Sequence, residues 1–410
     1  MTMQTAIQDF LTIKGVETAE ELHQATTLMT SIHCVDSSYL CRWLESHGTT
    51  YPRFKREHTR IALCNGELAG TLRISTDTFR IGEARLKMGG LGWVSIAPRF
   101  QNGNIRETLI SGTLEYLKEH RYHVAMCFAP SREYEPFGFV GSMSDYAVHI
   151  HCTKTLGPEK LSGRVRPVKP GDIGALQRMQ TLNSSNTSCS ILRERAHFAN
   201  QWETFKSATV FTNGQGKIEG YLKTSTDLEG LHIEEAEAVG EAAFRDIISY
   251  AFDVAKDGLI SQLVYHGPPD HPFMNVLSSI VSPEALRLSS GTAGLVRITD
   301  VEETLESMIP EWESRVHRCL LREMDCEVTL IIENKAYRIR VRFGAVDIAL
   351  QSGRNKFSVD RGVFTQLLNG YKGIAEVWPL KRRLVTREGR ALLETLFPKR
   401  DPYMALFDRF

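Results

Sequence analysis

The segment from Leu91 to Val140 constrains the fold of this 410-residue chain more than any other. A β-rich run at Leu91–Ile96 ends before Pro98, and a polar turn follows it at Gln101–Asn104. Because a turn between a strand and a helix collects free N–H groups at the positive end of the helix dipole, we expect a site for a phosphate-bearing ligand there. Apolar residues then recur close to the 3.6-residue period of a one-faced helix, at Ile105, Leu109, Ile110, Leu114 and Leu117.

The order of these motifs resembles motif A of the GNAT superfamily of N-acyltransferases. Val94-Ser95-Ile96-Ala97-Pro98 matches the family strand V-x-V-x-P. Gln101 takes the first position of the following Q/R-x-x-G-x-G/A, whereas Asn104 and Arg106 stand where two small residues are expected. Tyr134-Glu135-Pro136-Phe137-Gly138-Phe139 matches the segment Y-x-x-F-G-F/Y, and the resemblance implies that Tyr134 is the general acid.

The resemblance implies acetyl-CoA or another acyl-CoA as co-substrate and no metal. The pantetheine arm and the thioester carbonyl would contact the backbone of Val94 and Ile96. The pyrophosphate would bind the turn and helix start, made of Gln101, Asn102, Gly103, Asn104, Ile105 and Arg106. The Arg106 guanidinium could pair with a phosphate there. Since Gly92 allows close backbone approach, we also expect a β-bulge near it.

Size and composition place the chain among globular proteins with several domains. Its length suggests two to three domains, and its 42% apolar and 24% charged residues are ordinary values. Lys+Arg and Asp+Glu balance at 49 each, so no bulk charge draws the chain to nucleic acid or membrane. Eight scattered cysteines without CxxC spacing, no leader pattern near the N-terminus and no run of transmembrane length predict a cytoplasmic protein.

Three blocks follow one another along the chain, at 1–157, 158–295 and 296–410. The first block contains a hairpin with an Asn65-Gly66 type I′ turn, the motif region and a closing strand at Tyr146–Cys152. The second block repeats the pattern in weaker form, with a strand at Leu231–Val239 and a helix at Glu241–Ala255. Because no phosphate turn is recoverable between them, we expect a structural copy without a cofactor.

The third block begins near Val296 and ends on Phe410. It resembles the sterol carrier protein-like domain that closes the enhanced-intracellular-survival (Eis) acetyltransferases. The expected fold class is therefore α/β (α+β), with two tandem GNAT-like domains and a sterol carrier protein-like domain. The resemblance also implies a homo-oligomer, and a hexamer is one form that it suggests.

In the Eis family the C-terminal carboxylate acts as the base in the first domain, and Phe410 occupies that place here. An α-carboxylate has a low reference pKa, about 3.3–3.7, which desolvation in a closed cleft would raise. A phenol such as that of Tyr134 can donate a hydrogen bond to the leaving thiolate at neutral pH. The candidate contacts of the amine acceptor are Trp93, Asp36, Trp43 and Arg409.

The function expected from these features is N-acyl transfer from a CoA thioester to a primary amine of a small molecule. Two alternatives stay open, because the phosphate turn departs from the family pattern at Asn104 and Arg106. One is an acyltransferase that uses a non-CoA or carrier-protein thioester, with an acyl carrier protein as partner. The other is a catalytically silent relative that binds an apolar ligand or serves as an assembly module.

Overall fold

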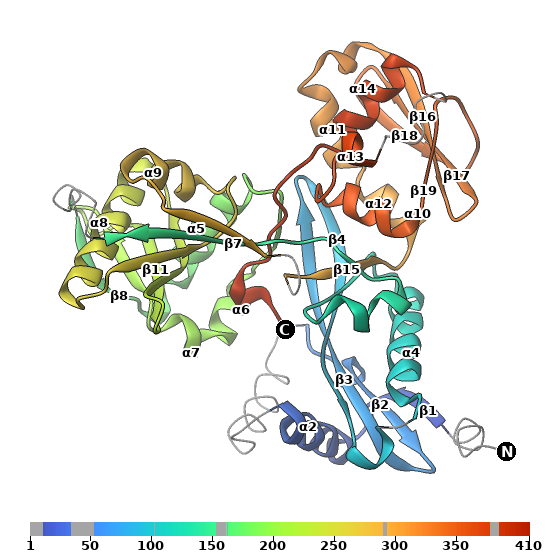
Figure 1. Cartoon of the computed structure of the whole chain (residues 1–410), viewed down its shortest axis with the longest axis horizontal. Helices are drawn as coiled ribbons and strands as arrows, with labels where there is room; N and C mark the ends of the chain where they lie inside the picture. The colour runs from blue at the N-terminus through green and yellow to red at the C-terminus, as the bar shows by residue number, and fades with distance from the viewer. Residues whose placement is uncertain are drawn as a thin grey trace.

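The computed structural model describes residues 11–33, 53–101, 103–152, 161, 163–289, 293–377 and 385–410. Within these ranges the strands form three sheets, and helices pack on each of them (Figure 1). We call each sheet, with the helices that pack on it, the first, second and third unit. The chain end lies between the first and second units (Figure 1).

The first sheet contains eight described strands. Seven follow the order β1 (Leu11–Gly15), β2 (Thr59–Cys64), β3 (Glu67–Ile81), β4 (Ala84–Ile96), β5 (Val124–Cys127), β15 (Leu295–Ile298) and β6 (Val140–Gly141), and β9 (Cys189–Ile191) pairs with β3. Its helices are α2 (Ala19–His33) and α4 (Ile105–Glu119). Asn65 and Gly66 have φ of 51° and 81° in the β2–β3 turn, so both central residues have the positive φ of the predicted type I′ hairpin.

The second sheet contains seven described strands. Their order is β14 (Ala285–Ser289), β7 (Asp145–His151), β13 (Gln262–His266), β12 (Leu231–Ala238), β11 (Ile218–Thr226), β10 (Thr209–Thr212) and β8 (Arg164–Pro167). The helices of this unit are α5 (Ile173–Ser184), α6 (Arg195–Asn200), α7 (Trp202–Phe205), α8 (Glu241–Asp257) and α9 (Pro272–Ile280).

Two strands lie in a different sheet from the rest of their predicted blocks. The expected closing strand of the first block, Tyr146–Cys152, is largely β7, and it pairs with β13 and β14 of the second sheet. β15 lies where the sequence places the start of the third block, and it pairs with β5 and β6 of the first sheet. The first and second sheets are therefore not continuous in sequence, and the assignment of Tyr146–Cys152 to the first sheet was wrong.

The third sheet has the order β18 (Ala345–Ala349), β17 (Lys335–Arg342), β16 (Asp325–Ile332) and β19 (Lys356–Val359) among the described strands. Its helices are α10 (Val301–Ser307), α11 (Ile309–His317), α12 (Arg361–Leu368), α13 (Ile374–Val377) and α14 (Arg387–Leu396). One buried cluster joins this unit to one side of the first sheet, and it includes Met126, Val296, Trp312 and Leu330. A separate cluster packs the other side of the first sheet against α4. The first sheet is thus packed on both sides.

Candidate active site

The parallel pairing of β4 with β5 ends at Gly90, and the chain end lies just beyond it. A Cβ atom on Gly90 would come within 2.2 Å of the Phe410 ring, and one on Gly92 within 3.1 Å of the Phe410 carboxyl carbon. The Phe410 ring also meets the Phe128 ring edge to face, with the centroids 5.2 Å apart. Glycine at both positions permits this close approach to the strand. We call this place, where β4 and β5 stop pairing, the first wedge.

β4 carries an extra residue at the first wedge. Thr71 and Arg73 of β3 pair with Ser95 and Gly92, so three steps along β4 match two along β3. Trp93 takes a φ of 58° there, which bulky residues rarely adopt. A bulge of this kind turns a side chain and the local backbone groups away from the regular ladder. The β-bulge that the sequence predicts near Gly92 is confirmed.

α2 covers the bulge through its last residue. The His33 ring packs edge-on against Trp93, with the centroids 5.6 Å apart. Its Nε2 atom lies 3.2 Å from the carbonyl oxygen of Val94. Val94 and Ile96, the predicted contacts of the pantetheine arm, are half-buried on this strand. One backbone acceptor of the predicted donor-binding strand is therefore already engaged within the protein.

The polar turn between β4 and α4 is described except for Asn102, which lies outside the described residues. Gln101 is exposed, and Gly103 and Asn104 are half-buried. Asn104 is the N-cap residue of α4 with a φ of −88°, and its side chain makes no capping hydrogen bond. Since the first N–H groups of a helix have no partner within the helix, this end of α4 offers donors to an anion.

Arg106, in the first turn of α4, is engaged within the protein. Its guanidinium pairs with the Glu133 carboxylate at 2.5 Å and lies over the Tyr134 ring, 5.5 Å from the centroid. The preceding residue, Ile105, is buried in the core between α4 and the sheet. A phosphate bound by Arg106 would therefore compete with Glu133.

Tyr134 lies between two short 3-10 helices and is 3% exposed. Its ring packs edge to face on Phe139, with the centroids 5.6 Å apart. Burial, together with the neighbouring Cys127 thiol, raises the pKa of Tyr134 to about 12, although the Arg106 guanidinium acts in the opposite direction. The phenol is therefore protonated at neutral pH and can act as a hydrogen-bond donor.

Sequence reasoning missed the cluster that holds the chain end. The fully buried Arg193 side chain donates to Asp408 at 2.7 and 3.1 Å, and to both oxygens of Glu235 at 2.9 and 2.7 Å. The Tyr221 hydroxyl also donates to Glu235. Asp408, two positions before Phe410, thus ties the tail to the second sheet. These partners lie 42 and 215 positions from Arg193, so no local spacing pattern could have revealed them.

Other contacts hold the tail along its length. The Asp401 N–H donates to Ser188 Oγ at 3.0 Å, and the Phe407 carbonyl accepts from the Gln201 amide at 3.1 Å. The Arg409 guanidinium pairs with Asp145 and lies over the Phe128 ring. The predicted acceptor contact Arg409 is therefore also a structural anchor of the tail.

A cleft of about 230 Å³ opens beside Phe410. Trp93, Arg409 and Phe410 line it, so three of the predicted site residues come together here. The predicted acceptor contacts Asp36 and Trp43 lie outside the described residues. The other walls come from β3, α6 and the segment before β2, and they include His58, Arg73, Asp77 and His197.

Tyr134 and Phe410 reach the end of β5 from opposite sides. Tyr134 belongs to the core cluster that contains Cys127, whereas Phe410 packs with Phe128 against the cluster shared with the third unit. Tyr134 is not among the described residues that line the cleft beside Phe410. The two predicted catalytic groups thus meet the same strand end, but only one of them lines this cleft.

In the described ranges, no group of three or more His, Cys, Asp and Glu side chains is arranged to hold a metal ion. No helix in these ranges is long and apolar enough to cross a membrane.

Comparisons with known proteins agree with this geometry. Residues 18–140 match the family model of the acetyltransferase (GNAT) domain. A probable N-acyltransferase from Enterococcus faecalis superposes with a TM-score of 0.78 at 14% identity, over 98% of this chain and 100% of that one. A GCN5-related N-acetyltransferase from Anabaena variabilis superposes with a TM-score of 0.76 at 16% identity, over 98% of this chain and 100% of that one. Eis1 from Mycobacterium abscessus superposes with a TM-score of 0.65 at 15% identity, over 97% of this chain and 100% of that one. At such identities the likeness shows a shared fold. A comparison of the sequence with curated proteins gives no match.

Proposed function

We propose that this chain, whose residues 18–140 match the acetyltransferase (GNAT) domain, is a GNAT-family N-acyltransferase that moves an acyl group from a CoA thioester to a primary amine of a small molecule. The observation that carries this proposal is the approach of the Phe410 carboxyl group to Gly92 in the first wedge. A carboxylate beside a cleft of about 230 Å³ supports a base facing a small acceptor.

In the proposed reaction the amine nitrogen attacks the thioester carbonyl, a C–N bond forms and the C–S bond breaks. The Phe410 carboxylate takes the proton that the amine loses. The Tyr134 hydroxyl donates to the leaving thiolate sulfur, and its raised pKa supports this role because the group stays protonated at neutral pH. Trp93 and Arg409 would contact the acceptor, since both line the cleft beside Phe410.

The donor would lie along β4 and reach the start of α4. The bulge next to Val94 and Ile96 supports binding of the thioester end by backbone groups. The uncapped N-terminus of α4 supports binding of a pyrophosphate through N–H groups. Arg106 could contribute a charged contact once it leaves Glu133.

The finer domain assignments are also proposals. We propose domains at 1–157, 158–295 and 296–410, with two exceptions. β7 counts with the second domain, because it pairs with β13, and β15 counts with the first, because it pairs with β5. The last domain would be sterol carrier protein-like, which its four-stranded sheet with helices supports. We also propose a homo-oligomer and a cytoplasmic location. The latter is supported by the six described cysteines, all of which are free.

Thiol release from acetyl-CoA and longer acyl-CoAs, measured against a panel of small primary amines, tests the proposed function. At least one pair should turn over, with one acylated amine formed for each thiol released. If calorimetry detects no binding of any CoA species and no amine is acylated, the proposal fails.

The Arg106–Glu133 ion pair favours a second candidate, which is transfer from a thioester without a nucleotide, such as that of an acyl carrier protein. Acetyl-pantetheine would then react as well as acetyl-CoA. Two variants separate the candidates further. If Arg106 clamps a phosphate, Arg106→Met should weaken CoA binding by about 1.5–3 kcal/mol, and Glu133→Gln should strengthen it. If no nucleotide binds, neither change should alter donor affinity.

A further inference from the structure

The first unit contains a second cavity, which the proposed reaction does not use. It has a volume of about 510 Å³ and lies at the carboxyl end of α4, away from the phosphate turn. Its walls come from the end of β1, the short 3-10 helix Arg56–His58 and the residue before it, the start of β2 and the end of α4. The residues that line it include Lys55, Arg56, Glu57, Arg60, Tyr116 and His120. We call it the Arg60 cavity.

Arg60 is buried at this cavity without an acceptor for its guanidinium. The residue is 9% exposed, and its Nε atom is enclosed and has no hydrogen-bond partner. None of the described residues accepts a hydrogen bond from its terminal nitrogens or forms an ion pair with it. The guanidinium lies over the Tyr116 ring, 4.5 Å from the centroid, and this contact holds it in place. Since only Nε is enclosed, the terminal nitrogens are the atoms that a ligand in the cavity can reach.

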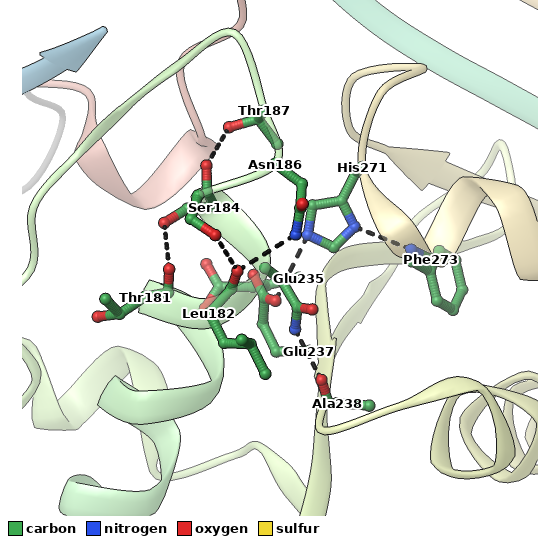
Figure 2. Close-up of polar contacts among 12 residues, drawn as sticks. Thr181, Leu182, Ser184, Asn186, Thr187, Glu235, Glu237, Ala238, His271 and Phe273 are labelled. Carbon is green, nitrogen blue, oxygen red and sulfur yellow. Dashed lines mark hydrogen bonds and ion pairs between the residues drawn. The ribbon is translucent and has the colours of Figure 1, made fainter. Parts of the chain in front are cut away.

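The second unit shows two ways in which a buried charge is relieved. Arg193 donates to both oxygens of Glu235, at 2.9 and 2.7 Å. Oε2 of Glu237 lies 3.4 Å from Nε2 of His271 (Figure 2), and burial raises the pKa of this carboxyl group, which favours its neutral form. Neither way is open to Arg60. Burial lowers the pKa of its guanidinium, but an arginine starts so high that it keeps its charge at neutral pH.

The two carboxylates that line the Arg60 cavity do not replace the missing partner. Glu57 pairs with Lys55 at 3.6 Å, and their side chains are 45% and 64% exposed. Glu17 pairs with Lys14 at 3.1 Å, and its side chain is 72% exposed. Water screens charges that are exposed to this degree, so they bind Arg60 weakly and repel an anion weakly. The enclosed guanidinium is not screened in the same way.

The remaining groups around the cavity are positive or already engaged. Within the described ranges, Arg56 donates to a backbone carbonyl at 3.5 Å and to no carboxylate. The Lys87 ammonium donates to the His120 carbonyl at 2.8 Å and offsets the charge of Glu119, which is exposed. The carboxyl end of a helix is itself negative, but here the Tyr116 carbonyl accepts from the His120 N–H at 3.0 Å. The His120 ring adds no negative charge in either of its protonation states.

We propose that the Arg60 cavity binds a small organic anion through a carboxylate or phosphate group. The terminal nitrogens of Arg60 donate to the oxygens of this group, and Arg56 adds a contact at the rim. Water in the cavity would hydrate these nitrogens but would supply no counter-charge to the buried guanidinium. The volume lies within the range of ligand pockets, about 300–1,000 Å³, and exceeds what an inorganic ion fills. His58, in the same 3-10 helix, lines the cleft beside Phe410, so the ligand would bind next to the proposed acceptor site.

Calorimetry and thermal melts of the full chain with sodium succinate and with sodium glycerol 3-phosphate test this site. Sodium chloride at the same ionic strength and uncharged glycerol serve as comparisons. We expect at least one of the two organic anions to bind saturably and raise the melting temperature, and neither comparison to do so. The anion that binds more tightly identifies the recognised group as carboxylate or phosphate. No saturable binding of either anion, or an equal response to sodium chloride, overturns the proposal.

Variants locate the binding at Arg60. Arg60→Met keeps the length of the side chain and removes its charge, so affinity should fall at least about tenfold, a change of about 1.4 kcal/mol. Arg85→Met removes the same charge from an exposed arginine of the first unit that does not line the cavity, and this matched control should bind as the parent does. Unchanged affinity in Arg60→Met would place the anion elsewhere, for example at the start of α4, and overturns the proposal.

Arg60→Lys keeps the proposal testable if Arg60→Met does not fold. Lysine keeps the charge but lacks the planar fork that binds two oxygens at once, so affinity should fall several-fold. Unchanged affinity in Arg60→Lys would then overturn the proposal.

Discussion

The first wedge has a counterpart in the second sheet, where β12 and β13 stop pairing, and we call this place the second wedge. The two wedges share a backbone plan and differ in the side chains that occupy them. Each lies where a parallel strand pair ends, and each is entered by a strand with one extra residue, on β4 and on β12. In the first wedge, Gly92 lies two residues past Gly90, the last parallel-paired residue of β4, and it faces the Phe410 carboxyl carbon. The same position in the second is Glu235, which binds Arg193. The bulge alone therefore does not make an active site.

The connections after the two bulged strands differ as well. β4 ends at Ile96 and α4 begins at Ile105, so eight positions separate the strand from the helix, and a short 3-10 helix at Pro98–Phe100 lies among them. β12 ends at Ala238 and α8 begins at Glu241, which leaves residues 239–240 and places an acidic side chain at the helix start. A negative side chain there disfavours an anion. Loop length and two glycines, rather than the fold, distinguish the wedge proposed to be catalytic from its copy.

The largest effect should come from extending the chain end, which tests whether the first wedge works through the Phe410 carboxylate. Two residues added after Phe410 would move the carboxylate by up to about 7 Å, since an extended residue spans about 3.3–3.6 Å. We expect turnover to be abolished and the melting temperature to stay the same, because Asp408 and Arg193 still hold the tail. Steady-state kinetics and thermal melts measure both.

The same two residues added before Met1 provide the control and should leave turnover unchanged. Full activity in the C-terminally extended protein would remove the carboxylate from the mechanism.

Tyr134→Phe should have the next largest effect. The change removes only the hydroxyl, so the packing on Phe139 is kept. Loss of a general acid should lower kcat by roughly 10²–10⁴-fold, with little change in acyl-CoA affinity. Tyr116→Phe is a matched control, because the Tyr116 side chain is also buried but its hydroxyl donates to Glu57, and neither residue lines the cleft beside Phe410. Equal kcat values for parent and Tyr134→Phe would show that the phenol is not the acid.

The third prediction tests whether Arg193 of the second unit anchors the C-terminal tail that ends in the first wedge. Arg193→Met leaves Glu235 and Asp408 buried without a counter-charge, so the free energy of unfolding should fall by about 3–5 kcal/mol. Urea denaturation measures this loss. Arg166→Met breaks the more exposed Arg166–Asp172 pair and should cost no more than about 1 kcal/mol. Similar losses in the two variants would contradict the anchoring role of Arg193.

Local patterns in the sequence were enough to predict most elements of the fold. The helix expected at Glu241–Ala255 is observed at Glu241–Asp257, and the bulge near Gly92 followed from the strand's glycines. Strand partners could not be predicted in the same way. The residues of β7 form a strand in either sheet, and the usual pairing of sequence neighbours favours the wrong one. The true partner, β13, lies more than a hundred positions further along the chain.

The candidate site shows the same limit. Trp93 and Phe410 were selected through motifs, and they do line one cleft. The contacts that fix them in place were invisible, because a pair such as Arg193–Asp408 depends on how two units dock. Arg106 is a similar case, since its pairing with Glu133 depends on where the segment after β5 returns to α4. Sequence patterns identify groups capable of chemistry, whereas tertiary structure decides which of them are already engaged.

The smallest predicted effect concerns pH and compares a buried histidine in each unit. Burial lowers the pKa of His58 to about 4 in the first unit and that of His197 to about 3 in the second. In the unfolded chain a histidine has a pKa of about 6.5, so between that pH and the folded value only the unfolded state takes up the proton. The contribution of these neutral histidines to the free energy of unfolding should therefore be complete above about pH 6.5 and should fall as the pH drops towards 4. His58→Asn should reduce the loss between pH 7 and pH 5 by about 1–2 kcal/mol, as measured by urea denaturation. An unchanged pH slope in this variant would mean that His58 is protonated in the folded protein as well.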